Sequence, residues 1–126
     1  MVAHEDQIAD VERRFGVRFP ADYRGFLLTR GSMEGFISPA RTYLVLHAID
    51  EIIPMNEAGD IEARFPGGVV IGGNGAREML TYDFRQAQPP LVLIDISAGS
   101  WSDALYQAPS LTALLAQLPG RGWSFA

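Results

Sequence analysis

Residues 69–84 read Val-Val-Ile-Gly-Gly-Asn-Gly-Ala-Arg-Glu-Met-Leu-Thr-Tyr-Asp-Phe and carry the strongest structural signal in the chain. The β-branched run 69–71 and the run 79–84 are both typical of strands, and residues 72–75 between them accept positive φ. The stretch therefore predicts a β-hairpin.

Further strands are expected on both sides of this hairpin. The nearly continuous apolar run 91–96 predicts a central strand that is covered on both faces, and residues 104–107 can form a short strand. Before the hairpin, residues 42–46 predict a strand and residues 48–55 a helix that Pro54 keeps short. Residues 57–68 are acidic and rich in Gly and Pro, which is typical of a surface loop.

Helices are expected at the two ends of the chain. Residues 5–15 have apolar side chains at helical spacing, and a second helix is expected from Pro20 to a stop at Gly31. The last helix is expected to begin after the N-cap Ser110 and to end at residues 119–120. The order predicts an α+β fold, with a mostly antiparallel sheet, an N-terminal helix pair and a C-terminal helix packed against it.

Length and composition favour one domain over residues 1–126. The chain is 48% hydrophobic and has no cysteine, which excludes a disulfide framework and a thiolate metal site and suits a reducing compartment. The first residues lack the features of a signal peptide, and no apolar run is long enough to span a membrane. We therefore expect a cytoplasmic protein with no membrane partner.

The charge balance bears on the partners of this protein. The formal net charge is −5, and all ten basic residues are Arg. An acidic protein repels phosphate backbones and attracts basic partners, so we expect a basic protein as ligand and no nucleic acid.

Motifs for catalysis are weak. The glycines at 72–75 lead into a strand and lack the lysine of a phosphate-binding loop. A small hydrolase that uses His47 with Asp50 or Asp83 stays open as an alternative, although no G-x-S-x-G motif supports it. No cofactor is expected.

A dense group of carboxylates lies in and before the predicted loop. Its spacing matches neither an EF-hand nor H-E-x-x-H, so no metal site is expected. On a mobile loop these side chains could steer a basic partner and imitate phosphates, which makes them the candidate partner-binding residues. They are Asp50, Glu51, Glu57, Asp60 and Glu62.

Residues 15–27, Phe-Gly-Val-Arg-Phe-Pro-Ala-Asp-Tyr-Arg-Gly-Phe-Leu, resemble the opening of the SUKH (Smi/Knr-type) superfamily. The resemblance continues through the glycine-rich hairpin to Tyr82-Asp83 and through the terminal helix after residues 108–110. That superfamily includes bacterial immunity proteins that neutralise polymorphic toxins, many of them nucleases, and a fungal regulator of cell-wall synthesis.

The resemblance implies binding without catalysis. The leading hypothesis is an immunity protein, monomeric or weakly dimeric, that binds a cognate toxin stoichiometrically. The alternative is a regulatory or scaffolding module that recognises another cellular protein.

Overall fold

Helices and strands alternate in groups along the chain. The computed structural model describes residues 1–37 and 41–125. The elements in chain order are α1 (Glu5–Phe15), α2 (Ala21–Thr29), β1 (Met33–Ile37), β2 (Thr42–Leu46), α3 (Ile49–Ala58), α4 (Ile61–Arg64), β3 (Gly68–Gly73), β4 (Glu78–Asp83), β5 (Leu91–Asp95), the 3-10 helix η1 (Trp101–Asp103), β6 (Leu105–Ala108) and α5 (Leu111–Arg121).

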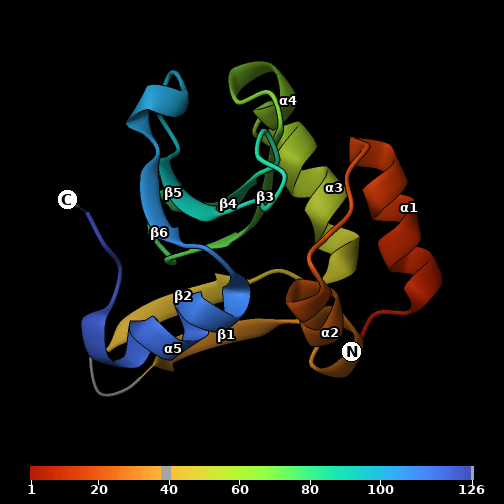
Figure 1. Cartoon of the computed structure of the whole chain (residues 1–126), viewed down its shortest axis with the longest axis horizontal. Helices are drawn as coiled ribbons and strands as arrows, with labels where there is room; N and C mark the ends of the chain where they lie inside the picture. Colours follow the sequence, from red (N-terminus) through yellow and green to blue (C-terminus); the bar gives the residue numbers. More distant parts are fainter. Residues whose placement is uncertain (38–40, 126) are drawn as a thin grey trace.

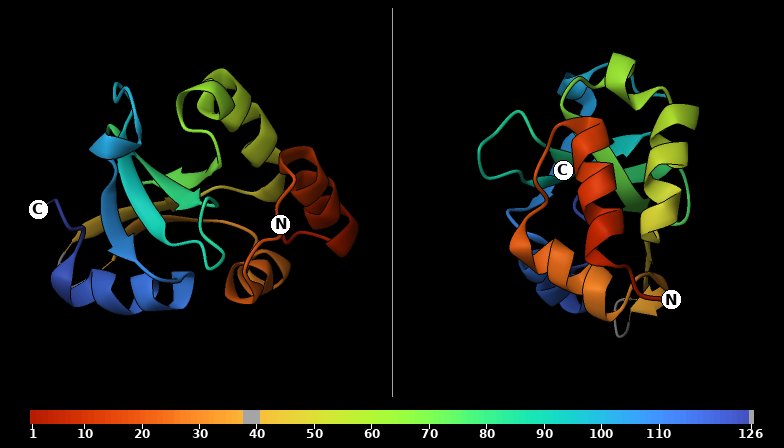
Figure 2. Two further views of the ribbon diagram at one scale, coloured as in Figure 1. Left: turned by 45° about the horizontal axis from the view of Figure 1, so that its top comes forward. Right: turned by 90° about the vertical axis from the view of Figure 1, so that its right-hand side faces the viewer.

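The strands form one six-stranded sheet in the order β1-β2-β3-β4-β5-β6. Every neighbouring pair is antiparallel. The sheet curls strongly, so that β1 and β2 lie across the bottom of Figure 1 while β3 to β6 rise above them. Two further directions of view show α1 beside α3, and α2 close to the start of α5 (Figure 2). The predicted α+β architecture, with its N-terminal helix pair and C-terminal helix, is confirmed.

The core has two parts, one on each face of the central strands. The larger part joins the buried faces of α1, α2, α3 and α5 to alternate residues of β3, β4 and β5, among them Ile71, Tyr82 and Leu93. The smaller part lies on the other face, where Ile61 and Phe65 cover their neighbours in β3 and β5. The expectation that the strand from Leu91 is covered on both faces is therefore confirmed.

The glycines of the hairpin serve a purpose that the turn prediction missed. Only Gly75 has a positive φ, at +78°. Gly72 and Gly73 lie inside β3, where a Cβ on Gly72 would lie 1.9 Å from the backbone oxygen of Val45. The glycine at 72 is therefore required by the close approach of β2, and not by a turn.

Several predicted boundaries were wrong. Pro54 does not shorten its helix: α3 passes through it to Ala58, because the buried Ile49, Ile52 and Asn56 hold the helix against the core. Half of the segment 57–68, which was expected as a loop, is therefore helical, with α4 following α3. The last helix likewise passes residues 119–120 and ends at Arg121.

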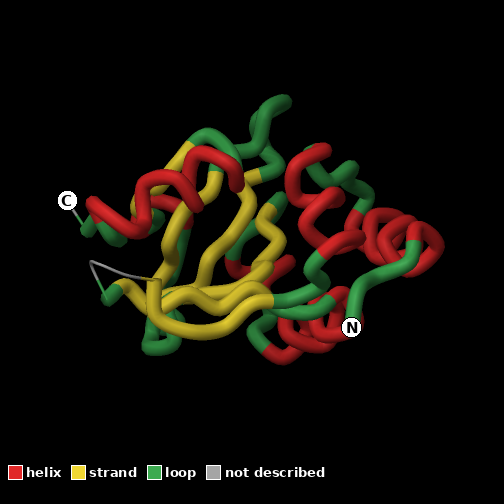
Figure 3. Tube along the Cα trace, turned by 90° about the horizontal axis from the view of Figure 1, so that it is seen from below, coloured by secondary structure: helices red, strands yellow, loops and turns green. Residues whose placement is uncertain are grey.

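Strand β1 was not predicted. Its side chains alternate between partly buried and exposed, but Gly35 interrupts the β-branched pattern that would have marked a strand. Figure 3 shows β1 and β2 as neighbouring strands at the lower side of that view. Within the described residues, no helix is long and apolar enough to cross a membrane.

Candidate functional site

The predicted partner-binding carboxylates lie on helices and not on a loop. All five are exposed, with Asp50 and Glu51 in the first turn of α3, Glu57 in its last turn, and Asp60 and Glu62 around the start of α4. At 1.5 Å per residue, Asp50 and Glu57 are separated by about 10 Å along α3. The structure therefore divides the set into two groups along one side of the molecule.

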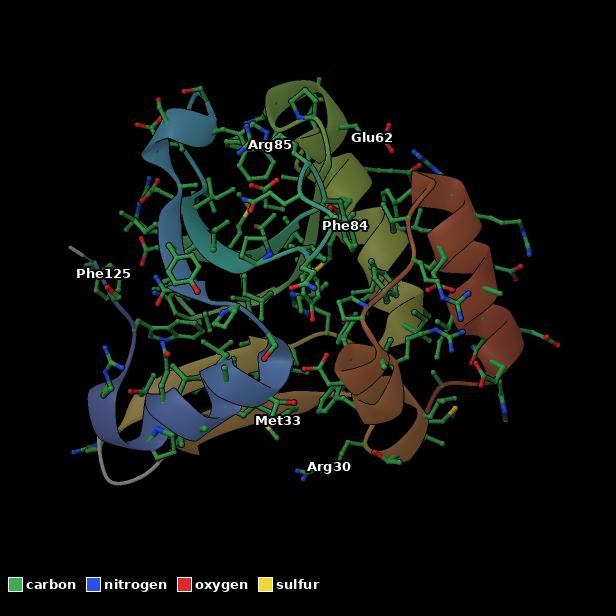
Figure 4. All side chains as sticks on the ribbon, viewed as in Figure 1. Arg30, Met33, Glu62, Phe84, Arg85 and Phe125 are labelled. Atoms are coloured by element: carbon green, nitrogen blue, oxygen red, sulfur yellow. The ribbon has the colours of Figure 1, made fainter. Side chains whose placement is uncertain are left out.

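Arg14 of α1 neutralises part of the second group. Its guanidinium lies 3.3 Å from a carboxylate oxygen of Glu57 and 2.5 Å from one of Glu62, and Figure 4 labels Glu62 at the upper end of this side. The hydrogen bonds with Glu62 and Glu57 raise the pKa of Arg14. Among the described residues no basic side chain pairs with Asp50 or Asp60, so these two carry the least compensated charges of the set.

Glu51 contributes mainly to the start of α3. Its Oε1 accepts a hydrogen bond from the backbone N–H of Ala48 at 2.9 Å, and it lies 3.9 Å from Nδ1 of His47. The carboxylate nearest to His47 in the described chain is therefore neither Asp50 nor Asp83, the two proposed for a hydrolase. The carboxylate of Asp83 is bonded to Arg85.

Asp83 is tied to Arg85 at the end of β4. Its carboxylate accepts two hydrogen bonds from the Arg85 guanidinium, each of 2.9 Å, and one from the Arg85 backbone at 3.0 Å. Burial on its own would raise the pKa of Asp83, but these hydrogen bonds hold it below its ordinary value. Arg85 also stacks on the ring of Trp101 at 4.1 Å. This cluster, near the Arg85 label of Figure 4, fastens the loop after β5 to the sheet.

The aspartate of the Pro-Ala-Asp-Tyr motif is also structural. Asp22 accepts hydrogen bonds at 2.9 and 3.0 Å from the backbone N–H and the hydroxyl of Thr112, in the first turn of α5. It therefore joins α2 to α5, and the following Tyr23 is fully buried against Phe19 and Tyr82.

Beside the first acidic group, α3 and the sheet enclose an apolar groove of about 640 Å³. Met55 of α3 and Ile96 after β5 both line it, and 39% and 48% of their surfaces are accessible. The complete lining is Val45, His47, Pro54, Met55, Ala58, Gly59, Gly72, Gly73, Gly75, Ala76, Glu78, Met79 and Ile96.

The groove combines apolar walls with acidic borders. Glu78 is the one carboxylate among its lining residues, and Glu51 adjoins it through His47. None of the described residues that line it is an arginine. Flexible methionines such as Met55 and Met79 suit a surface that must adapt to an apolar side chain of a partner. The arrangement fits a protein segment that carries an apolar anchor with basic neighbours.

Sequence reasoning missed this groove. Its walls come from β2, α3, β3, β4 and the residue after β5, which are far apart along the chain. The only local signal was the pair of glycines at 72 and 73, which leave part of the surface without side chains.

The comparisons with known proteins agree with the resemblance seen in residues 15–27. The model of the SMI1 / KNR4 family (SUKH-1) matches residues 2–117. An uncharacterized protein of Bacillus subtilis (strain 168), YnaB, is 37% identical over 118 residues, which cover 82% of this chain and 76% of that protein. From the match across most of its length, the chain belongs to the SMI1/KNR4 (SUKH-1) family.

Proposed function

We propose that this protein is an immunity protein that binds a cognate toxin stoichiometrically and performs no chemistry of its own. Toxin immunity is a common role in the family to which the chain belongs. The observation that carries the proposal is the apolar groove with acidic borders, because such a surface can bind a protein segment. We further propose that the toxin is basic and is bound in the cytoplasm.

The proposed recognition has an electrostatic step and a packing step. The net charge of −5 and the five carboxylates along α3 and α4 attract a basic partner over a distance. Asp50 and Asp60 act most strongly in this step, because the charges of Glu57 and Glu62 are shared with Arg14. An apolar anchor of the toxin then enters the groove between Met55 and Ile96 and slows dissociation.

The test begins with a toxin domain encoded beside the gene for this protein. The two chains are co-expressed, and growth rescue and the binding isotherm of the purified pair are measured. We expect one-to-one binding and restored growth. Absence of binding to that toxin, together with capture of a regulatory or cell-wall protein from the lysate, would favour the scaffolding alternative.

Two double variants distinguish electrostatic steering by the carboxylates of α3 and α4 from the effect of the overall net charge. Asp50→Arg with Asp60→Arg changes the net charge by the same amount as Asp6→Arg with Asp103→Arg, which lie elsewhere on exposed surface. The first pair is expected to slow association roughly tenfold at low salt, and the second pair much less. Equal effects of the two pairs would show that the acidic residues of α3 and α4 have no special part in binding.

A further inference from the structure

Strand β1 leaves one edge of the sheet open. It is the first strand in the sheet order and pairs only with β2. Outside that pairing, no described residue hydrogen-bonds to its backbone. An open edge is a template for a further strand.

The register shows which backbone groups point outward. The His47 backbone N–H donates to the oxygen of Ile71 at 2.9 Å, so odd-numbered residues along β2 direct their polar groups toward β3. Even-numbered residues of β2 therefore bond to β1, and their partners there are Met33, Gly35 and Ile37. The backbone N–H and C=O groups of Glu34 and Phe36 consequently point away from the sheet.

We propose that a second copy of this chain binds to this edge, so that the two β1 strands pair antiparallel about a two-fold axis at Gly35. In this register Glu34 of each copy lies opposite Phe36 of the other. All the outward-pointing backbone groups of Glu34 and Phe36 are then hydrogen-bonded across the axis. The two Gly35 residues form the central non-hydrogen-bonded pair, where strands approach most closely and the absence of a side chain fits.

The side chains on the exposed face of β1 are complementary under the same symmetry. Phe36 is 65% exposed and packs edge-to-face on Tyr43 at 4.9 Å. The guanidinium of Arg41 lies 5.8 Å from the centre of the Phe36 ring, and no carboxylate among the described residues pairs with it. Because Phe36 faces Glu34 of the second copy, Arg41 comes close to that carboxylate.

Glu34 is restrained by a contact within its own copy. Its Oε2 accepts a hydrogen bond from the Tyr43 hydroxyl of β2 at 2.6 Å, which leaves its other carboxylate oxygen available for an ion pair. Each copy thus contributes one cation and one anion, and the two-fold axis generates the ion pair twice. A pair of short strands with two exposed ion pairs makes a weak dimer, which forms as the protein concentration rises.

The first experiment measures the sedimentation coefficient over a series of protein concentrations. The wild type is expected to shift from monomer to dimer. Phe36→Pro removes an outward N–H without affecting the bonds to β2, and is expected to abolish the dimer, whereas Phe36→Ala keeps that N–H and weakens it less. A wild type that stays monomeric at every concentration would overturn the proposal.

Exchange of the charges tests the register without relying on proline. Glu34→Arg and Arg41→Glu each place like charges opposite one another, and are each expected to weaken dimerisation roughly tenfold. The double variant restores opposite charges and is expected to recover most of the loss. Tyr43→Phe is the control for the lost hydroxyl contact of Glu34. If the double variant loses as much dimer affinity as the two single variants together, the ion pair and this register are wrong.

A cysteine pair gives a covalent readout, because the chain has no cysteine of its own. Residues opposite each other in a hydrogen-bonded pair have Cα atoms about 5.5 Å apart, a separation that a disulfide spans. Glu34→Cys with Phe36→Cys is therefore expected to give an oxidised dimer on a non-reducing gel. Each single variant places its cysteines too far apart along the strands, so equal cross-linking by a single variant would exclude the register.

Discussion

At the β6 edge of the sheet, the side-chain amide of Gln107 donates to the backbone oxygen of Ser124 at 2.6 Å and accepts from its N–H at 2.8 Å. Gln117 of α5 in turn donates to the backbone oxygen of Gln107 at 3.1 Å. At the β1 edge, no described residue makes such contacts with the outward groups of Glu34 and Phe36. One edge is thus closed by side-chain amides and the other is left open.

Asn56 covers the backbone of β3 at Val70 in the same way. Beyond Ile71, strand β2 no longer runs beside β3, and Asn56 of α3 bonds to both the N–H and the C=O of Val70, at 2.8 and 2.9 Å. Its amide imitates the backbone of a missing strand. The fold therefore closes strand edges where they border the core, and leaves β1 accessible.

The greatest loss of stability is expected at Gly72, where β2 and β3 approach each other most closely. Gly72→Ala would bring a methyl group to 1.9 Å from the Val45 oxygen, so β2 and β3 must separate. We expect a loss of about 4 kcal/mol in the free energy of unfolding, measured by urea denaturation. Gly35→Ala is the matched variant at the open edge: it meets no neighbour and should cost about 1 kcal/mol through its φ of +152°. Equal losses would contradict the comparison.

The second-largest loss of stability is expected for Asn56, whose amide takes the place of a missing strand. Asn56→Ala leaves the N–H and C=O of Val70 without partners in a buried position, which is expected to cost about 3 kcal/mol in the same assay. Asn74→Ala, in the turn before β4, is the control and should cost below about 1 kcal/mol because water can replace its contacts. A loss for Asn56→Ala no larger than the control would show that Val70 finds another partner.

The two outer edges can be compared directly. Gln107→Ala removes the hydrogen bonds to Ser124 and is expected to lower the free energy of unfolding by about 2 kcal/mol. Phe36→Ala at the β1 edge should lower it by only about 0.5 kcal/mol in dilute solution, since its ring is mostly exposed. Thermal unfolding at low protein concentration checks both, and a reversed order would refute the assignment of closed and open edges.

The smallest expected effect concerns pH at the end of β4. Because the folded-state pKa of Asp83 is lowered, its ionised form stabilises the fold above its unfolded pKa of about 4, and this contribution is lost as the pH falls through the folded pKa. Asp83→Asn should therefore reduce stability at neutral pH and flatten its decline in acid. Hydrogen bonds from Ser97 and Arg77 lower the pKa of Asp95 as well, so Asp95 also contributes to the loss of stability in acid. The quantity to measure is therefore the difference in the free energy of unfolding between Asp83→Asn and the wild type at each pH. An unchanged acid profile would exclude this role.

Sequence reasoning found the elements whose patterns are local. Residues 42–46 and the strands around the hairpin were predicted because consecutive β-branched and aromatic residues mark a strand by themselves. Pro54 misled because its local preference to break a helix is outweighed by the burial of Ile52 and Asn56, which depends on contacts with β3. The exposure of the five carboxylates followed from their polarity, but their division by Arg14 did not.

The α+β class, the family and the acidic balance can be predicted from the sequence alone, since these depend on residue types, local periodicity and motif order. The position of the groove, the carboxylates that keep uncompensated charge and the open edge of the sheet depend on the three-dimensional structure. Those properties arise where segments distant in the chain meet: Arg14 meets Glu62, Asn56 meets Val70, and Gly72 meets Val45. Contacts of this kind leave no periodic trace in the sequence, because each is fixed by the path of the whole chain and not by the residues beside it.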